Sequence, residues 1–380
     1  METVIDRKGV IMKLLHINCN YLGTTLHQCM VEHLDACGVA STVFVPTYNP
    51  ENSTITPNEN VLVSKCFRKW DRIFFYHKQS KIQRALETAV EVGDYDLLHA
   101  YTLFTDGNCA YKLAKKYGVD YVVAIRNTDV NDFFKWRPHL IRRGIRIMEK
   151  AKAIFFLSES YKQQVLQKYI PARYRESFSA KSFIMPNGID DFWLENCRED
   201  VDRELGVPLR LVYAGRIDGN KNIATTQAAM KKLSERGCEA HLTVVGKVAD
   251  EKIYRQISAH PSTTCIPPKS KEDLLGIYRE NDIFVMPSFT ESFGLVYAEA
   301  ISQGLPVVYS IGQGFDKQFS EGEVGYHADA YSADSVADSI LKIVENYSRI
   351  TTNISNKSKK YSWASICSQY CHIYQSLIQK

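Results

Sequence analysis

Two acidic residues, Glu291 and Glu299, lie eight positions apart in the stretch PSFTESFGLVYAEAISQGLPV (287–307). Glu291 occupies a Ser/Thr-rich turn, whereas Glu299 lies within an apolar run that is typical of a helix ended by Gly304. The residues three and four positions away from Glu299 supply no cation. A carboxylate in such a place needs a polar partner. The two hydroxyls of a ribose would serve, and a distant arginine is the alternative.

The start of the same helix, Phe293–Leu295, is a candidate site for a diphosphate. Helix N-termini offer unsatisfied N–H groups and a partial positive charge, and Gly294 would let the backbone approach a ligand closely. At ~1.5 Å per residue, Glu299 lies about 7–8 Å further along the helix. Glu291 could therefore reach the group at the opposite end of the diphosphate. The alternative is that Glu291 belongs only to the turn.

A second candidate is the loop in VYAGRIDGNKN (212–222), where a strand runs into Gly215, then Arg216, with Lys221 five residues later. An arginine can bind phosphate through a bidentate fork, and a lysine adds a compact charge beside it. Two cations on one loop repel each other unless an anion joins them. This order favours an anion site over an ordinary surface turn with solvated charges.

The elements that must position these residues alternate between short apolar runs and amphipathic helical stretches, which predicts parallel sheets covered by helices. The expected strands are Lys13–Ile17, Ser41–Val45, Leu97–His99, Tyr121–Ile125, Ala153–Leu157, Ser182–Met185, Arg210–Ala214, His241–Val245, Thr264–Pro267, Ile283–Met286 and Val307–Tyr309. We therefore predict an α/β protein with two doubly wound, Rossmann-like domains. Ligands bind such sheets at the carboxyl ends of the strands, so two facing domains would form a central cleft.

The chain length of 380 residues suits two domains. We expect a polar lead-in over residues 1–11, an N-terminal domain over 12–188, a turn-rich and charged hinge over 189–204, and a C-terminal domain over 205–360. Residues 361–380 are expected to form a terminal helix.

Composition excludes several classes of protein. The apolar runs are far shorter than the ~20 residues that span a bilayer, and the N-terminus lacks the apolar core of a signal peptide. The ten cysteines form no Cys-x-x-Cys pair, which favours a reducing cytosol and no structural metal. Net charge is +4, too mild for a nucleic-acid-binding protein, although residues 1–190 carry 26 Lys+Arg against 19 Asp+Glu. That basic half suits an anionic partner.

Four motifs together resemble the retaining glycosyltransferases of family four. They are Gly215-Arg216-x4-Lys221, Glu291-x7-Glu299, MPNGID (185–190) and SQGLPVV (302–308), in the family's order and spacing. The family consists of nucleotide-sugar enzymes with two Rossmann-like domains (the GT-B type). The stretch YSWASICSQYCHIYQSL (361–377) is similar to the terminal helix that crosses back to the first domain. The stretch IGQGFDKQFSEGEVGY (311–326) is similar to bacterial members that build surface polysaccharide.

The resemblance implies roles for matching positions. Arg216 and Lys221 would neutralise the departing diphosphate, Glu299 would hold the ribose hydroxyls, and Glu291 would contact the transferred sugar. The donor-binding set would be Gly23, Gly215, Pro267, Phe293, Gly294, Leu295 and Glu299. The stretch 265–269 would lie beside the nucleobase. Retention would proceed by front-face attack without a protein nucleophile.

The first domain departs from the family at one site. Gly23 matches a Gly-rich loop, although the second glycine of the usual pair is Thr24 here. In YVVAIRNTDVNDFF (121–134), Arg126 stands where relatives often have His, and Asn127 where they have Gly, while Asp129 keeps the pattern. We expect Arg126, Asn127 and Asp129 to face the sugar or an anionic acceptor. The alternative is that Arg126 pairs within the first domain.

Two further features have competing interpretations. Asp94 and Asp96 form an Asp-x-Asp pair that could bind a metal, but they more simply cap the helix before the strand at 97–99. The stretches 66–84 and 133–150 interleave basic and aromatic residues. They could rest on an anionic membrane surface, form amphipathic core helices, or bind single-stranded nucleic acid by stacking. We do not expect nucleic acid.

The sequence thus predicts a metal-independent, retaining glycosyltransferase that needs no cofactor. It would move a hexose-type sugar from a nucleoside diphosphate, UDP or GDP, to a growing and lipid-linked glycan, in the cytoplasm or at the inner face of the membrane. The alternatives are transfer to a small soluble acceptor, and binding of a nucleotide sugar without turnover. A dehydrogenase is disfavoured because no Gly-x-Gly-x-x-Gly follows the first strand.

Overall fold

The computed structural model describes residues 12–198 and 204–378, which divide into two compact units. Unit 1 holds the chain up to Phe156, Val165–Met185 and the segment from Trp363 onward, and unit 2 holds Leu157–Gln164 and Pro186–Ser362. The division thus falls after residue 185, and a short segment of the first half clusters with unit 2. The part of the expected hinge that is described contains a short helix, and residues 199–203 lie outside the described residues.

Unit 1 is built on a seven-stranded parallel sheet in the order β3-β2-β1-β4-β5-β6-β7. Its strands are β1 (Met12–Ile17), β2 (Val39–Thr47), β3 (Val61–Lys65), β4 (Leu97–Ala100), β5 (Tyr121–Ile125), β6 (Ala153–Phe156) and β7 (Ser182–Ile184). The central strands β4, β5 and β6 are buried along their whole length, as expected for a parallel sheet covered on both faces. The chain reverses its direction of winding between β1 and β4, so ligands are expected at the carboxyl ends of these strands.

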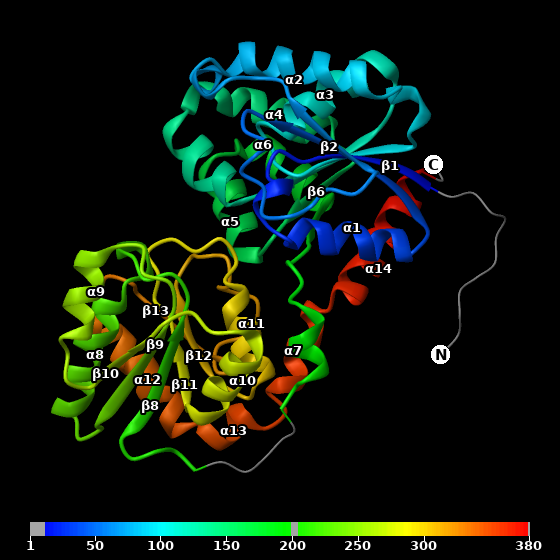
Figure 1. Ribbon diagram of the computed structural model, residues 1–380. Helices are drawn as coiled ribbons and strands as arrows, with labels where there is room; N and C mark the ends of the chain where they lie inside the picture. The colour runs from blue at the N-terminus through cyan, green and yellow to red at the C-terminus, as the bar shows by residue number, and fades with distance from the viewer. Residues whose placement is uncertain (1–11, 199–203, 379–380) are drawn as a thin grey trace. The chain divides into compact units, whose positions relative to one another are not determined.

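The helices of unit 1 are α1 (Leu26–Ala36), α2 (Phe75–Ala89), α3 (Asp106–Tyr117), α4 (Ile141–Lys150), α5 (Glu159–Lys168), α6 (Ala172–Ala180) and α14 (Trp363–Ile378), with α5 divided between the units after Gln164. Helices α2, α3 and α4 lie side by side on one face of the sheet, and α1 packs with α14 on the other (Figure 1). Both faces of the sheet are therefore covered, which completes a doubly wound fold.

The terminal helix α14 belongs to unit 1, as the family resemblance implies. Trp363, Ile366, Tyr370 and Tyr374 recur at helical spacing and are nearly fully buried against the core. That core includes Leu14 of the first strand. The end of the chain thus closes the sheet with which the described chain begins.

Unit 2 repeats the plan with a six-stranded parallel sheet in the order β10-β9-β8-β11-β12-β13. Its strands are β8 (Leu209–Ala214), β9 (Ala240–Val245), β10 (Thr263–Ile266), β11 (Ile283–Val285), β12 (Val307–Ser310) and β13 (Gly325–Ala328). Its helices are α7 (Asp191–Glu195), α8 (Ile223–Glu235), α9 (Glu251–Ser258), α10 (Lys271–Glu280), α11 (Leu295–Ser302), α12 (Ala333–Glu345) and α13 (Tyr347–Thr351). Here the reversal falls between β8 and β11.

The predicted fold class, two doubly wound α/β domains, is confirmed. Two strands, β3 and β13, were not expected from the sequence. Both lie at a sheet edge and are partly exposed, so they lack the continuous apolar pattern of a buried strand. The placement of the two domains about a cleft stays a prediction.

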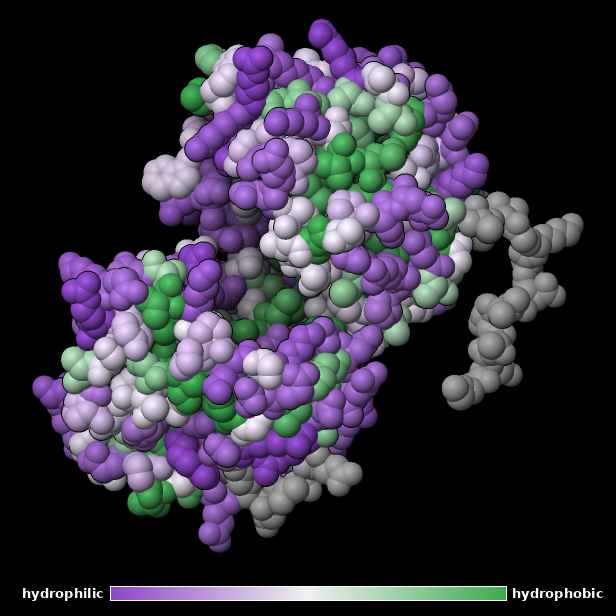
Figure 2. Space-filling view, viewed as in Figure 1, coloured by the Kyte–Doolittle hydropathy of each residue, from purple (hydrophilic) through white to green (hydrophobic). Residues whose placement is uncertain are grey.

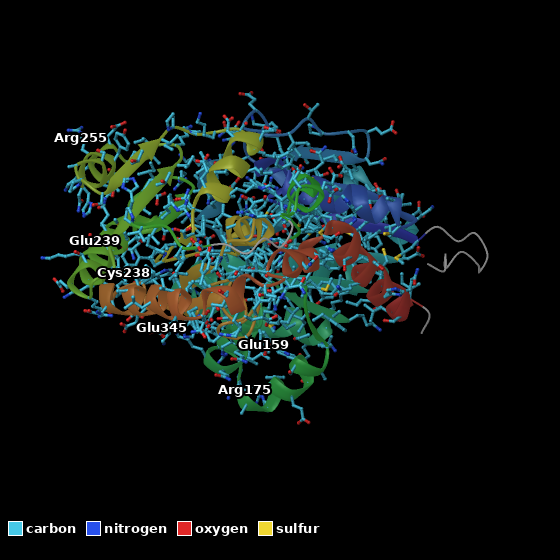
Figure 3. The ribbon with its side chains drawn as sticks, turned by 90° about the horizontal axis from the view of Figure 1, so that it is seen from below. Glu159, Arg175, Cys238, Glu239, Arg255 and Glu345 are labelled. Atoms are coloured by element: carbon cyan, nitrogen blue, oxygen red, sulfur yellow. The ribbon has the colours of Figure 1, made fainter. Side chains whose placement is uncertain are left out.

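Hydrophilic side chains cover most of the outer face seen in Figure 2, and hydrophobic groups occupy smaller areas. Arg255 on α9 and Glu345 on α12 are exposed and directed outward, away from the sheet of unit 2 (Figure 3). Among residues 12–198 and 204–378, no helix combines the length and the apolar character needed to cross a bilayer.

Candidate functional site

The loops after β8 and β11 meet at the carboxyl edge of the sheet in unit 2, because these strands are neighbours. Asn220 joins the two loops through three hydrogen bonds. Its carbonyl oxygen accepts the Phe289 N–H at 2.9 Å, its side-chain oxygen accepts the Thr290 N–H at 3.0 Å, and its amide donates to the Thr290 carbonyl at 2.8 Å. Two motifs that are about seventy residues apart in sequence therefore form one structure.

Lys221 and Glu291 form an ion pair within this structure, with 2.6 Å between Nζ and Oε2. The exposed fractions of the two side chains are 20% and 10%, so the pair is largely shielded from water. The other carboxylate oxygen of Glu291 accepts the Ser292 N–H at 3.0 Å. The structure thus brings together two of the residues that the sequence selected for catalysis.

The backbone of Glu291 is held from two further directions. Its N–H donates to the side-chain oxygen of Gln313 at 2.9 Å, and its carbonyl accepts the Tyr161 hydroxyl at 2.7 Å. Gly314 lies against the same turn, where a Cβ would come within 1.9 Å of the Ser292 carbonyl oxygen. Glu291 is therefore fixed in place before any ligand arrives.

Arg216 lies on the same loop, but its side chain is 67% exposed. Its guanidinium binds Asp218, with Nε 2.9 Å from Oδ2, and the other oxygen of Asp218 accepts the Lys221 N–H at 3.1 Å. Burial alone would raise the pKa of Asp218, but the hydrogen bonds from Arg216 and Lys221 lower it below its usual value. Asp218 therefore organises both cations of the loop.

Helix α11 begins at a glycine that no other residue could replace without strain. Gly294 has φ +77°, and a Cβ there would lie 2.4 Å from the Tyr297 ring. The N–H groups of Gly294, Leu295 and Val296 have no partner among the described residues. The helix thus presents free donors at its N-terminus.

Phe293 and Gly215 can contact a donor only through their backbone atoms. The Phe293 side chain is buried against the Tyr361 ring, with 5.6 Å between ring centroids, so only its backbone is available to a ligand. Gly215 ends β8 with φ +151°, and a Cβ on Gly246 of the next strand would come within 1.7 Å of the Gly215 oxygen. The two strand ends can approach this closely because residue 246 is a glycine. Pro267 is exposed directly after β10.

Glu299 lies on α11 and is partly buried. Burial, and to a lesser extent the nearby Asp190, raise its pKa to about 7, while Lys271 acts in the opposite direction. Lys271 itself is paired with Asp190. Within the described part of the chain, no hydrogen bond or ion pair reaches the Glu299 carboxylate, and the distant arginine weighed above is not found.

The remaining predicted residues lie in unit 1. Gly23 ends the 3-10 turn Tyr21–Gly23, with open space around it. Arg126 donates a hydrogen bond to the Tyr370 hydroxyl of α14 and acts to lower the pKa of that hydroxyl, so Arg126 does interact within unit 1. The side-chain amide of Asn131 donates to Asn127.

Asp129 is a buried carboxylate that braces the neighbouring loops. It accepts the backbone N–H groups of Leu103 at 3.0 Å, Phe104 at 3.2 Å and Arg126 at 3.0 Å. Burial raises its pKa to about 6, although these amide bonds counteract part of the effect. Asp129 thus positions the strand ends, and its contact with a sugar stays a prediction.

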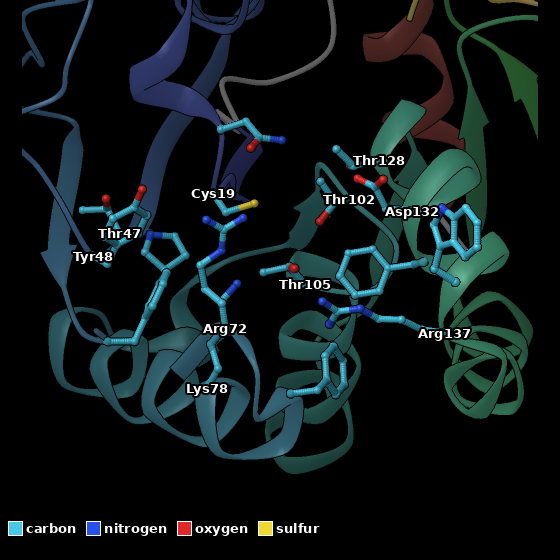
Figure 4. A pocket seen from close by; sticks show the side chains of 16 residues that line it. Cys19, Thr47, Tyr48, Arg72, Lys78, Thr102, Thr105, Thr128, Asp132 and Arg137 are labelled. Carbon is cyan, nitrogen blue, oxygen red and sulfur yellow. The ribbon is translucent and has the colours of Figure 1, made fainter. Parts of the chain in front are cut away.

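Unit 1 contains a pocket of about 470 Å³ near the carboxyl ends of β1, β2 and β4 (Figure 4). Its walls carry cations, aromatic rings and hydroxyls, from the residues Cys19, Asn20, Pro46, Thr47, Tyr48, Phe67, Arg72, Phe75, Lys78, Thr102, Thr105, Thr128, Asp132, Phe133, Trp136 and Arg137. Several of these belong to the basic and aromatic stretches 66–84 and 133–150. Sequence reasoning did not place those stretches around a pocket.

One group in unit 2 has the composition of a metal site. Ligand atoms of Asp316, Glu321 and His327 lie within 4.8 Å of one another. The His327 ring lies 3.2 Å from Asp316, and Tyr309 donates to Glu321 at 2.9 Å, so the group is already internally bonded. At the Asp-x-Asp pair, Asp96 accepts the Lys13 N–H at 2.8 Å and joins two strands.

Two family models match the chain. The model described as Glycosyltransferase Family 4 covers residues 28–191, and the one described as Glycosyl transferases group 1 covers residues 202–361. The chain is a glycosyltransferase with a family-four domain in its first half. The first matched region contains β2 to β7 of one sheet, and the second contains β8 to β13 of the other.

Curated relatives of this glycosyltransferase include D-inositol 3-phosphate glycosyltransferases. That of Corynebacterium glutamicum is 29% identical over 192 residues, which is 46% of this chain and 46% of the relative. The match to this relative thus spans less than half of its length. That of Corynebacterium jeikeium is 25% identical over 311 residues, or 74% of this chain and 73% of the relative.

Solved structures show the same fold at low sequence identity. Sucrose-phosphate synthase from Thermosynechococcus elongatus has a TM-score of 0.73 at 17% identity, over 97% of this chain and 99% of the other. The lipopolysaccharide outer core galactosyltransferase WaaB has a TM-score of 0.73 at 14% identity, over 96% and 100%. HepE of Anabaena, in complex with UDP, has a TM-score of 0.69 at 14% identity, over 96% and 100%.

Sequence reasoning missed the residues that hold the family-four motifs together. Asp218, Asn220, Gln313 and Tyr161 act through hydrogen bonds between segments distant in sequence. A local signal existed for two of them, because Asp218 lies between Arg216 and Lys221, and Gln313 lies between two glycines after a strand. Nothing local to Tyr161 indicates its contact with Glu291.

Proposed function

We propose that this chain is a retaining, metal-independent glycosyltransferase that moves a hexose-type sugar from a nucleoside diphosphate, UDP or GDP, to a growing glycan. The observation that carries the proposal is the arrangement along α11. Among the described residues, the Glu299 carboxylate and the N–H groups at the helix N-terminus have no hydrogen-bond or ion-pair partner, and the Lys221–Glu291 pair lies beside that terminus. A ribose, a diphosphate and a sugar would use these groups in that order.

Electrostatics supports the binding of the donor. The open N–H groups and Lys221 would surround the diphosphate, and Arg216 would exchange Asp218 for a phosphate oxygen. The ribose hydroxyls would donate to the ionised form of Glu299. Two structural neighbours are also described with such donors, namely HepE of Anabaena with UDP-glucose and the Escherichia coli trehalose-6-phosphate protein with UDP-2-fluoro glucose.

The proposed step breaks the bond between the sugar C1 and the diphosphate oxygen and forms a bond from C1 to an acceptor oxygen on the same face. The proton of the acceptor hydroxyl moves to the departing diphosphate. Negative charge grows on that diphosphate in the transition state, so cations fixed beside it lower the barrier. Lys221 and Arg216 would supply this charge without a metal ion. Glu291 would orient the sugar.

The acceptor proposed first is a lipid-linked glycan at the inner face of the membrane. An exposed group of large side chains in unit 1, Trp70, Ile73, Phe74 and Tyr76, supports a surface contact with lipid. We name it the aromatic patch. The second candidate is a small soluble acceptor, which the curated relatives favour because they are named for an inositol phosphate. Binding of a nucleotide sugar without turnover is the remaining alternative.

The experiment that tests the donor site is a thermal-shift series with UDP, GDP, ADP and dTDP. A ligand at a hundred times its dissociation constant stabilises a protein by about 2.7 kcal/mol. We expect one nucleotide to raise the melting temperature of the wild type, little effect on Glu299→Ala, and a normal response in Glu345→Ala, whose exposed acid lies on α12. If no nucleotide stabilises the wild type, the donor site is wrong.

Turnover and stereochemistry need a second measurement. With the donor that binds, the anomeric configuration of the product by NMR should equal that of the donor sugar, with undiminished rate in EDTA. An inverted product would refute retention. A rate that falls in EDTA and returns with a divalent cation would refute metal independence. Binding without any transfer would favour the non-catalytic alternative.

A further inference from the structure

The pocket of unit 1 is lined by three cations, Arg72, Lys78 and Arg137. Within residues 12–198 and 204–378, none of their side chains forms a hydrogen bond or ion pair. Figure 4 shows these three side chains around the same hollow, contributed by separate parts of unit 1. Like charges gathered without an anion repel one another, which favours a ligand of negative charge.

Aromatic rings, not carboxylates, hold the three cations in place. Arg72 lies 5.9 Å from the Tyr48 ring centroid, and Lys78 lies 4.7 Å from that of Phe67. Arg137 lies 4.9 Å from the ring centroid of Phe133, which also lines the pocket. A ring attracts the cation but leaves its N–H groups free to donate to a ligand.

Nearby acids offset the charge of these cations only in part, and Asp106 acts electrostatically on Lys78. Asp71 is fully buried and paired with Lys81 at 2.8 Å. Asp106 accepts the Thr102 hydroxyl at 3.0 Å, and burial raises its pKa to about 7, so much of it is neutral near that pH. Asp132 also lines the pocket and supplies one negative charge against the three positive charges. The pocket therefore has an excess of positive charge.

The volume of the pocket and the side chains that line it restrict the class of ligand further. A volume of about 470 Å³ falls in the range of small-molecule sites. Phe75 and Trp136 add apolar surface, and Trp136 is 71% exposed. The hydroxyl of Thr105 also lines the pocket and can bind a ring hydroxyl. A ligand that combines a ring with an apolar face, several hydroxyl groups and an anionic group would suit these lining residues.

We propose that this pocket is the acceptor subsite and that Arg72, Lys78 and Arg137 bind an anionic group of the acceptor, best matched by a phosphate ester. The forked arginines suit phosphate oxygens, and the lysine adds a partly buried point charge. The role as acceptor subsite rests on the proposed function. The anion could come from a soluble sugar phosphate or from a lipid headgroup.

Calorimetric titration without donor tests the subsite on its own. The probes are inorganic phosphate, D-glucose 6-phosphate, D-glucose and water-soluble dihexanoyl phosphatidic acid. We expect wild-type protein to bind inorganic phosphate and at least one of the two esters, and to bind glucose far more weakly. Arg72→Gln and Arg137→Gln should each weaken phosphate binding about tenfold or more, since one charge-assisted contact is lost.

The matched control is Arg84→Gln, which removes an exposed cation from α2 outside the pocket. It should leave phosphate binding unchanged. Tighter binding of glucose 6-phosphate than of the lipid assigns a soluble source, and the reverse order assigns a headgroup. Equal losses in all three variants, or no phosphate binding by the wild type, would overturn the proposal.

Nucleotide binding distinguishes the pocket hypothesis from the donor-site hypothesis, because Lys221, Glu291 and Glu299 lie in unit 2. The pocket variants should retain the nucleotide response of the wild type, which also shows that they fold. Loss of phosphate binding with normal nucleotide binding confirms a separate anion site. A wild type that binds phosphate but no nucleotide would leave the pocket standing and refute the donor site.

Discussion

At the scale of the residue, Glu299 is a carboxylate held where its charge is unfavourable. Its pKa is raised to about 7 by burial, whereas the ordinary value for glutamate is near 4.3. Between these values the unfolded chain loses its proton first, so the folded state loses stability as pH rises. Above pH 7 the accumulated cost is about 3 kcal/mol. A ligand that donates hydrogen bonds to the ionised group would recover part of it.

We therefore predict that Glu299→Gln raises the free energy of unfolding at pH 8 by up to about 3 kcal/mol, and changes it little at pH 4. Urea titrations at pH 4, 6 and 8 measure this difference. Glu345→Gln is the control and should show no such trend, because that side chain is exposed. An effect of Glu299→Gln that is the same at every pH would show that the carboxylate is not strained.

The Lys221–Glu291 pair gives a second prediction, because each partner is shielded from water. Lys221→Met leaves a buried charge without its partner, and should lower the free energy of unfolding by about 3 kcal/mol and abolish transfer. Adding Glu291→Gln should restore much of the stability but not the activity. The measurement is a double-mutant cycle by urea unfolding.

The control pair is Lys232 and Glu235, which lie 3.2 Å apart with side chains 37% and 50% exposed. Lys232→Met should cost less than about 1 kcal/mol, because solvent screens that pair. If Lys221→Met were equally mild, water would have access to the ion pair, and its proposed role beside the diphosphate would lose support.

At the scale of the element, helix α2 and the segment before it combine a buried face with an exposed apolar patch. Within α2, Phe75, Gln79, Ile82 and Leu86 are buried at helical spacing and attach the helix to unit 1. The aromatic patch lies at and just before the helix start, where Ile73 is 76% exposed and Phe74 59% exposed. The amphipathic-helix and membrane-surface interpretations of stretch 66–84 are therefore compatible.

We predict that the aromatic patch binds anionic vesicles. Phe74→Ser combined with Ile73→Ser should reduce sedimentation of the protein with vesicles of phosphatidylcholine and phosphatidylserine several-fold, because apolar area is lost from the interface. Binding of the wild type should weaken with salt. The control is Tyr331→Ser, which removes an aromatic ring that is 81% exposed in unit 2. If the variant that combines Phe74→Ser and Ile73→Ser bound vesicles as well as the wild type does, a membrane role for the patch would be refuted.

The sequence was sufficient for the alternation of elements and for the motifs after β8 and β11, because buried parallel strands and glycine turns have local signatures. It was insufficient for the π-helical turn Asp129–Phe134 that leads to Arg137. It also could not show that the Asp129 carboxylate accepts hydrogen bonds from three backbone N–H groups. These features depend on which loops meet in space.

At the scale of the whole molecule, α14 closes unit 1 over a set of buried histidines. Tyr374 of α14 hydrogen-bonds His99 at 2.8 Å, and Tyr101 lies 3.0 Å from the ring of His16. The terminal helix was expected over residues 361–380, and its described part runs from Trp363 to Ile378. The sequence could not show that its tyrosines complete a buried polar network.

The buried histidines of this network predict how the free energy of unfolding changes at acidic pH. Burial lowers the pKa of His16 to about 3 and that of His27 to about 3, and lowers that of His99 well below its usual range. The unfolded chain takes up these protons near pH 6.5, whereas the folded chain does not. Each histidine therefore removes stability as pH falls below 6.5, by up to about 1.4 kcal/mol per pH unit.

Buried carboxyls act in the opposite direction, since the pKa of Asp106 is raised to about 7 and that of Asp129 to about 6. The net profile of the wild type is therefore shallow, and a comparison with a variant isolates the histidine. His16→Gln should lose stability at pH 7.5, where it breaks a buried hydrogen bond, and should recover relative to wild type by about 1.4 kcal/mol for each pH unit below 6.5. The control His372→Gln changes an exposed ring on the same helix α14 and should show a constant difference. Parallel profiles for His16→Gln and wild type between pH 6.5 and 4.5 would mean that His16 is protonated in the folded chain, and that α14 does not seal this network from protons.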